Sequence, residues 1–92
     1  MNISFVFSSD NETLNSKWSE LLETFTINNL ILQKEDWINF EGLMNNEITE
    51  IMLQDFETTL FKVEQKLVTF QKSNNDYEII PITHFYIIPV KI

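Results

Sequence analysis

Residues 46–72 contain neither glycine nor proline, and apolar side chains recur through them at steps of three and four. The apolar positions are Ile48, Met52, Phe56, Leu60, Val63, Leu67 and Phe70. This spacing matches the 3.6-residue period of one helix face, whereas a strand needs alternation. Asn46 suits a helix start, and Lys66 and Lys72 suit the negative end of the helix dipole. The pattern therefore predicts one long helix over residues 46–72.

The carboxyl-terminal part of this stretch also fits a strand. Residues 67–70 read Leu-Val-Thr-Phe, which favours β structure, and residues 73–76 read Ser-Asn-Asn-Asp, which favours a turn. In this alternative, residues 67–70 form a hairpin with residues 77–82. The helix is preferred because the apolar period continues through residues 67–70, and the hairpin is kept as the alternative.

The opposite side of the predicted helix carries an acidic stripe with one aromatic ring in it. Its members also step by three and four: Glu47, Glu50, Gln54, Glu57, Phe61 and Glu64. An aromatic side chain within a polar ring is typical of the anchor of a protein–protein interface. We predict that these residues, apart from Gln54, bind a protein partner, and that Phe61→Ala leaves folding nearly intact. A solvated helix face, with Phe61 packed against later strands, is the alternative.

Residues 34–42 are a second candidate for partner binding. They hold two large rings, three carboxylates and the only glycine of the chain, which predicts a loop or a short helix. Loops on a rigid scaffold often carry binding residues, so we predict partner contacts at Glu35, Asp36 and Trp37. The alternative is a hydrophobic plug, in which Trp37 and Phe40 cover the core.

The amino-terminal part predicts a strand followed by a helix. Residues 3–7 alternate in the manner of a strand with one buried face. Ser9 and Glu12 match a capping box, in which each side chain satisfies a free backbone amide at a helix start. A helix is predicted over residues 11–25, with Trp18 on its buried side.

The remaining segments predict short strands. Residues 30–32 are a brief apolar run that we interpret as a strand. The carboxyl-terminal end is rich in β-branched and aromatic residues, which predicts strands at 77–80 and 83–90, with Pro81 at an edge or a bend. The whole chain is expected to be a single α+β domain, in which a small antiparallel sheet packs on two main helices in the order β-α-(β)-α-β-β.

The charge of the chain is strongly one-sided. Fourteen acidic residues oppose six basic ones, and the formal net charge is −8. Such a field repels nucleic acid and accelerates encounter with basic surfaces. Direct binding of DNA or RNA is not expected, because phosphate contacts need Lys and Arg. Solubility is an equally good explanation of the acidity.

Most kinds of catalytic and metal chemistry lack their residues in this sequence. The chain has no cysteine, one glycine and one histidine. Disulfides, thiolate metal sites and glycine-rich phosphate loops are therefore excluded. His84 lies in an apolar predicted strand, where a structural role is favoured. We predict no catalytic residue, metal or cofactor, and neither a membrane span nor a signal peptide, which together favour the cytoplasm.

Two classes of function fit these observations. In size and charge the chain is similar to bacterial immunity proteins that block nuclease toxins, although it matches no family motif. That resemblance implies a basic protein partner, a nuclease whose nucleic-acid-binding surface is covered. A phage-type inhibitor of a nucleic-acid-binding defence protein is a variant of this hypothesis. In the second class, residues 77–92 continue a sheet across a homodimer, and the protein is a structural subunit without an inhibitory role.

Overall fold

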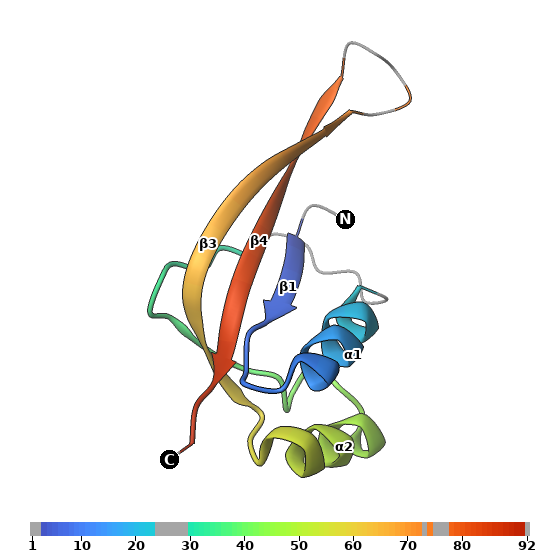
Figure 1. Ribbon diagram of the computed structural model, residues 1–92, viewed down its shortest axis with the longest axis vertical. Helices are drawn as coiled ribbons and strands as arrows, with labels where there is room; N and C mark the ends of the chain where they lie inside the picture. Colours follow the sequence, from blue (N-terminus) through green and yellow to red (C-terminus); the bar gives the residue numbers. More distant parts are fainter. Residues whose placement is uncertain (1–2, 24–29, 73, 75–77, 92) are drawn as a thin grey trace.

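The computed structural model describes residues 3–23, 30–72, 74 and 78–91. The elements are β1 (Ile3–Phe7), α1 (Glu12–Leu22), β2 (Trp37–Asn39), α2 (Asn46–Phe56), β3 (Leu60–Lys72) and β4 (Ile79–Pro89). Figure 1 shows the two helices together at one end of the molecule. The α+β class and the predicted order of strands and helices are confirmed.

The four strands form one sheet in the order β1-β4-β3-β2. β3 is antiparallel to both β2 and β4, whereas β1 runs parallel to β4. The sheet is thus mixed, and the prediction of a purely antiparallel sheet is wrong on this point. A hairpin forces antiparallel pairing between consecutive strands, but β1 and β4 are joined through the whole chain and are free of that constraint.

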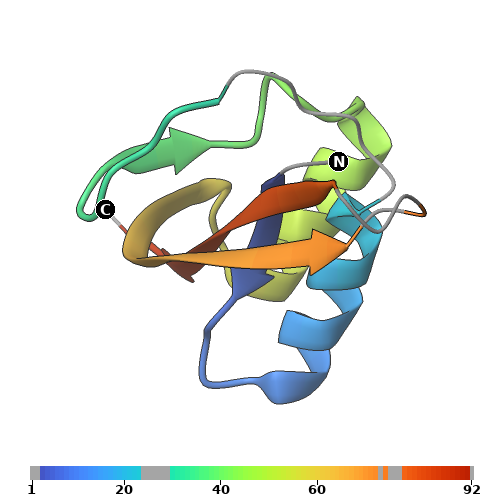
Figure 2. The same ribbon diagram turned by 90° about the horizontal axis from the view of Figure 1, so that it is seen from above.

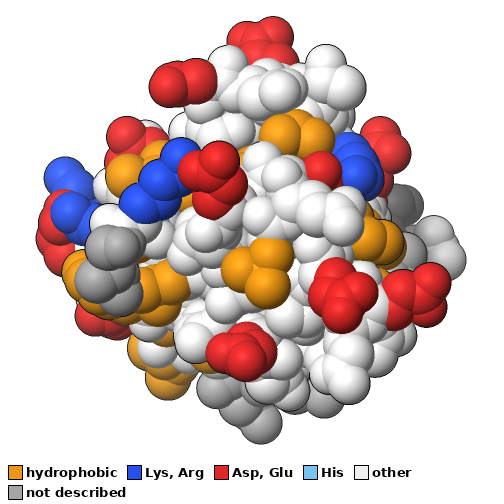
Figure 3. Space-filling model, turned by 90° about the horizontal axis from the view of Figure 1, so that it is seen from below, with side chains coloured by type: hydrophobic (Ala, Val, Ile, Leu, Met, Phe, Trp, Pro, Cys, Tyr) orange, Lys and Arg blue, Asp and Glu red, His pale blue; other side chains and the backbone are white. Residues whose placement is uncertain are grey.

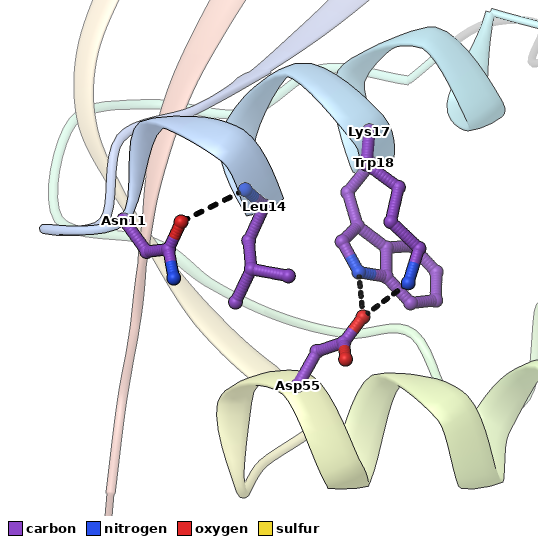
Figure 4. Close-up of polar contacts among 5 residues, drawn as sticks. All are labelled: Asn11, Leu14, Lys17, Trp18 and Asp55. Atoms are coloured by element: carbon purple, nitrogen blue, oxygen red, sulfur yellow. Dashed lines mark hydrogen bonds and ion pairs between the residues drawn. The ribbon is translucent and has the colours of Figure 1, made fainter.

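Asn11, and not Ser9, caps α1. The side-chain oxygen of Asn11 accepts the backbone N–H of Leu14 at 3.1 Å (Figure 4). The backbone N–H and the hydroxyl of Ser9 instead donate to the side-chain oxygen of Asn15, at 2.9 and 2.6 Å. The predicted capping box with Glu12 is therefore wrong, because Asn11 occupies the N-cap position and Ser9 donates to Asn15.

The predicted long helix is also wrong, because α2 ends at Phe56. Glu57 follows with a φ of 62°, in the left-handed region, and its backbone N–H donates to the Leu53 carbonyl at 2.9 Å. β3 then forms the hairpin with β4 that was the alternative, with Phe70 opposite Pro81. β3 carries apolar side chains on both faces, such as the neighbours Leu67 and Val68, so steps of three and four occur in this strand as well as in a helix.

Two smaller strand predictions also need correction. Residues 30–32 lie in no strand, and Leu30 and Leu32 pack against the core instead. The two predicted carboxyl-terminal strands are one continuous β4, although residue 77 lies outside the described residues. Pro81 sits beyond the stretch of β4 that pairs with β1, so its missing N–H removes no ladder bond on that side.

The core is built from aromatic rings on one face of the sheet. Its buried rings are Phe5, Phe7, Trp18, Phe40, Phe56, Phe61 and Phe85. Phe7 stacks on Phe56 with ring centroids 5.6 Å apart, and Phe61 meets Phe7 edge-on at 5.1 Å. Trp18 is fully buried, as the helix pattern predicted. This cluster joins β1, both helices and the near ends of β3 and β4 into one packed base.

β3 and β4 continue past this base as a twisted ribbon, which we call the arm (residues 65–72 and 79–84). β1 pairs with β4 as far as Thr83, and beyond that residue the arm has two strands. Figure 1 shows that the arm extends beyond both helices, and Figure 2 shows the twist of its two strands from above. The molecule measures 45 × 26 × 24 Å along its principal axes. Every residue of β3 from Glu64 onward is exposed. In the described part of the chain, no helix is long and apolar enough to cross a membrane.

Candidate protein-binding surface

Asp55 fastens α2 to α1. Its Oδ2 accepts hydrogen bonds from the Trp18 indole N–H at 2.8 Å and from Lys17 Nζ at 2.7 Å (Figure 4). Partial burial alone would raise the pKa of Asp55, but the hydrogen bonds from Lys17 and Trp18 outweigh it and lower that pKa. Asp55 therefore stays charged at neutral pH and fixes which side of α2 faces solvent.

The outward side of α2 combines carboxylates with apolar side chains. Asn45 caps the helix by accepting the Ile48 N–H at 2.9 Å, and Met52 and Phe56 are buried on the inner side. The exposed side, which we call the α2 acidic face, consists of Glu47, Glu50, Ile51, Leu53, Gln54 and Glu57. Leu53 is 45% exposed and Ile51 is 37% exposed. Figure 3, drawn from the end where the helices lie, shows acidic side chains with hydrophobic ones between them.

Glu35 and Glu57 share an unusual backbone and a lysine partner. Their φ angles of 79° and 62° lie in the left-handed region that L-residues rarely adopt. Glu57 pairs with Lys91 at 2.9 Å, and Glu35 pairs with Lys62 at 2.6 Å. In each case the hydrogen bond from the lysine is the largest cause of a lowered carboxyl pKa. Both predicted binding residues are thus held as anions in tight turns.

The segment before β2 splits into a structural part and an exposed part. The backbones of Glu35 and Asp36 bond to Val63 of β3, each at 2.8 Å, and the Asp36 side chain accepts the Gln33 N–H at 2.8 Å. Trp37 is 56% exposed and lies opposite Lys62, whereas Phe40 is fully buried. The plug therefore consists of Phe40, and Trp37 is left open to solvent.

Phe61 does not lie on the surface, and its prediction as an interface anchor is wrong. It is 0% exposed and meets Phe7, Phe40 and Phe56 in the core, with centroid distances of 5.1 to 5.5 Å. Glu64 is exposed, but it lies at a register shift of β3 rather than on a helix. The acidic stripe therefore stops at Glu57, because the helix that would carry it further ends there.

Leu53 and Ile51 are the apolar residues that the sequence pattern missed. Both are exposed in α2, whereas the expected anchor was sought farther along a helix that does not continue. A helical projection limited to residues 46–57 places Ile51 next to Glu47 and Gln54, and Leu53 next to Glu50 and Glu57, because residues three and four apart are neighbours on a helix surface. The signal for that limit is the pair of β-branched residues Thr58 and Thr59.

Two open clefts adjoin this surface. One, of about 450 Å³, is lined by Leu53, Glu57, Thr58, Thr59 and Lys91. The other, of about 550 Å³, is lined by the loop after β1, the end of α2 and the end of β4, and its lining residues include Asp10, Asp55 and Glu64. Carboxylates at the rim of such clefts suit the cationic side chain of a protein partner.

Comparisons with protein-family models, with curated proteins and with solved structures find no match to this chain. Within the described ranges, no group of three or more His, Cys, Asp or Glu side chains is arranged to hold a metal ion. His84 lies on the arm, where its Nε2 and the Thr69 hydroxyl are 2.7 Å apart. The surface is therefore interpreted through its charge and its apolar residues.

Proposed function

We propose that this protein is a small acidic inhibitor that binds a basic protein through the α2 acidic face. The partner that suits it is a nuclease toxin, and the protein acts as an immunity protein that covers the nucleic-acid-binding surface. The observation that carries the proposal is the exposed pair Ile51 and Leu53 among the carboxylates of α2, a helix that Asp55 joins to α1. Apolar anchors within a charged rim are typical of protein interfaces.

The distribution of ion pairs supports this assignment. Lys17, Lys62 and Lys91 are engaged by Asp55, Glu35 and Glu57. No ion pair within the described residues involves Glu47 or Glu50, so both charges face the solvent uncompensated. Carboxylates in this state attract basic surfaces over roughly one Debye length, about 8 Å at physiological salt. They take the place that phosphates occupy on a nuclease.

The backbone of Glu57 is a second supporting feature. Glycine adopts a φ of 62° without steric conflict, whereas another residue there costs on the order of 1 kcal/mol or more. A glutamate at this position therefore lowers the stability of the protein and places a charge at the end of the α2 acidic face. We expect Glu57→Gly to make the protein more stable and to weaken partner binding.

The experiment begins with capture of partners on the immobilised protein at low salt, followed by elution with a salt gradient. A captured nuclease is then tested for cleavage of nucleic acid with increasing amounts of inhibitor. We expect inhibition to saturate at a fixed stoichiometry and binding to weaken as salt rises.

Matched variants test the surface itself. Replacing Glu47 and Glu50 by Gln should weaken binding about tenfold or more. The same change at Glu20 of α1 and at Glu23, which directly follows α1, alters the net charge equally and should have little effect. Leu53→Ala should cost about 1–2 kcal/mol of binding. Equal losses for the two glutamate pairs, or an unaffected Leu53→Ala variant, would rule out the α2 acidic face as the binding surface.

A further inference from the structure

β3 has a free edge along the arm. β2 pairs with β3 only between Leu60 and Lys62, and Val63 is bonded to the segment before β2. From Glu64 to Lys72, no described strand pairs with this edge. Alternate backbone N–H and C=O groups of a strand point to each side, so this edge presents unpaired groups to solvent. Such an edge is a template for another strand.

The side chains along this edge are unusually apolar for an exposed strand. Phe70 is 71% exposed, Val68 is 46% exposed and Leu67 is 42% exposed. The other edge of the arm is less suited to pairing, because Pro81 of β4 has no N–H to donate. Edge strands are usually protected by charges, and Lys66 and Lys72 are the charged residues of β3 beyond Glu64. Repulsion between these lysines therefore limits the registers in which a second strand can pair with β3.

We propose that two copies of this chain pair through the free edges of β3, antiparallel, with Val68 on the twofold axis. The opposite residues in this register are Glu64 with Lys72, Lys66 with Phe70, and Val68 with its own counterpart. Each Glu64 thus faces a Lys72 of the other copy, and each Lys66 faces the ring of a Phe70. The Val68 and Phe70 side chains of both copies meet at the centre on one face.

Charge selects this register over its neighbours. In a symmetric antiparallel pair the twofold axis passes beside one residue, so the nearest alternative registers are centred on Thr69 and on Leu67. A centre at Thr69 places Lys66 opposite Lys72, and like charges in this position are destabilising. A centre at Leu67 pairs only residues 64–70, because the segment before β2 and β2 itself occupy the edges of Val63 and Lys62 that would lie opposite Gln71 and Lys72.

The same geometry keeps the acidic bases apart. In the proposed register, Val63 of one copy and Val63 of the other lie ten residues apart along the joined strands, roughly 33 Å at about 3.3 Å per residue. This separation is several Debye lengths, so the repulsion between the two bases is screened. The arms meet in the middle, and both α2 acidic faces point outward. The pairing does not rest on the proposed inhibitory function.

Cysteine scanning reads the register directly, because the native chain has no cysteine. The purified full chain is made with Leu67→Cys, Val68→Cys, Thr69→Cys or Phe70→Cys and is oxidised. Opposite residues have Cα atoms about 4.5–5.5 Å apart, within the roughly 4.4–6.8 Å of a disulfide. We expect rapid cross-linking of the Val68→Cys variant. Thr69→Cys is the matched control, since its two sulfurs are held on diagonal positions.

Charge reversal tests the pairing without a covalent bond. Sedimentation equilibrium of the native chain should show a dimer whose fraction rises with concentration. Glu64→Lys alone or Lys72→Glu alone should weaken the dimer about tenfold or more, because two attractive pairs become repulsive. The double variant should restore it. A native chain that stays monomeric at every concentration, a dimer not rescued by the double variant, or faster cross-linking at Leu67, Thr69 or Phe70 would overturn the proposal.

Discussion

Phe61 and Phe70 lie on the same strand and have opposite environments. Phe61 is fully buried among Phe7, Phe40 and Phe56, whereas Phe70 is 71% exposed on the arm. Both are aromatic residues in β-prone surroundings, so the local sequence does not separate them. The helices cover the near half of the hairpin, and they do not reach the far half (Figure 1). The base of the molecule therefore holds the buried rings, and the arm leaves apolar side chains exposed.

The largest effect expected from this comparison is that of Phe61→Ala. Removal of a fully buried ring with three edge-on aromatic neighbours should cost about 3–5 kcal/mol of unfolding free energy. Urea denaturation followed by tryptophan fluorescence measures this loss. A Phe61→Ala protein as stable as the native one would contradict the distinction between a packed base and an exposed arm.

A smaller effect is expected where the two helices are fastened together. Asp55→Ala removes the acceptor of the Trp18 and Lys17 hydrogen bonds and leaves the indole N–H, in the packed base, without its partner. We expect a loss of about 1–3 kcal/mol. Lys17→Ala is the matched control, because it removes only the more exposed of the two bonds and should cost less. Equal losses would mean that the indole bond adds little.

The same carboxylate gives a prediction about pH. Asp55 has a lowered pKa in the folded state, so its charge contributes stability above the unfolded value of about 3.9, and that contribution is lost as pH falls through the folded value. The stability difference between the native chain and Asp55→Asn should therefore shrink below about pH 4. Comparing the two chains cancels the general relief of acidic repulsion at low pH. A difference that grows on acidification would contradict the lowered pKa.

The smallest effect on stability is expected for Phe70→Ala. Phe70 is 71% exposed and lies opposite Pro81 in the hairpin, so removal of its ring should cost less than about 1 kcal/mol in the monomer. Denaturation at low protein concentration measures this value beside that of Phe61→Ala. A loss near that of Phe61→Ala would show that the arm is packed in solution.

Local sequence patterns were sufficient to predict a strand or a helix where a segment follows one clear period. The strand at residues 3–7 and the buried side of the helix around Trp18 follow from alternation and from the helical period. Glu47 and Glu50 are exposed in α2, and Glu57 directly follows that helix and is also exposed. The predicted acidic stripe is wrong at Phe61, because it assumed that the helix continues. Residues 60–72 instead form β3 and pair with β4.

The amino-acid sequence by itself determined the α+β class, the acidity and the number of aromatic residues available to the core. These properties depend on composition and on short-range periodicity. Only the tertiary structure decided where α2 ends, that β1 runs parallel to β4, and which rings are buried. Those outcomes depend on pairing between residues far apart in the chain, whose gain in burial and hydrogen bonding exceeds local preference. Phe61 and Phe70 differ for that reason alone: one meets Phe7 across the core, and the other extends past it.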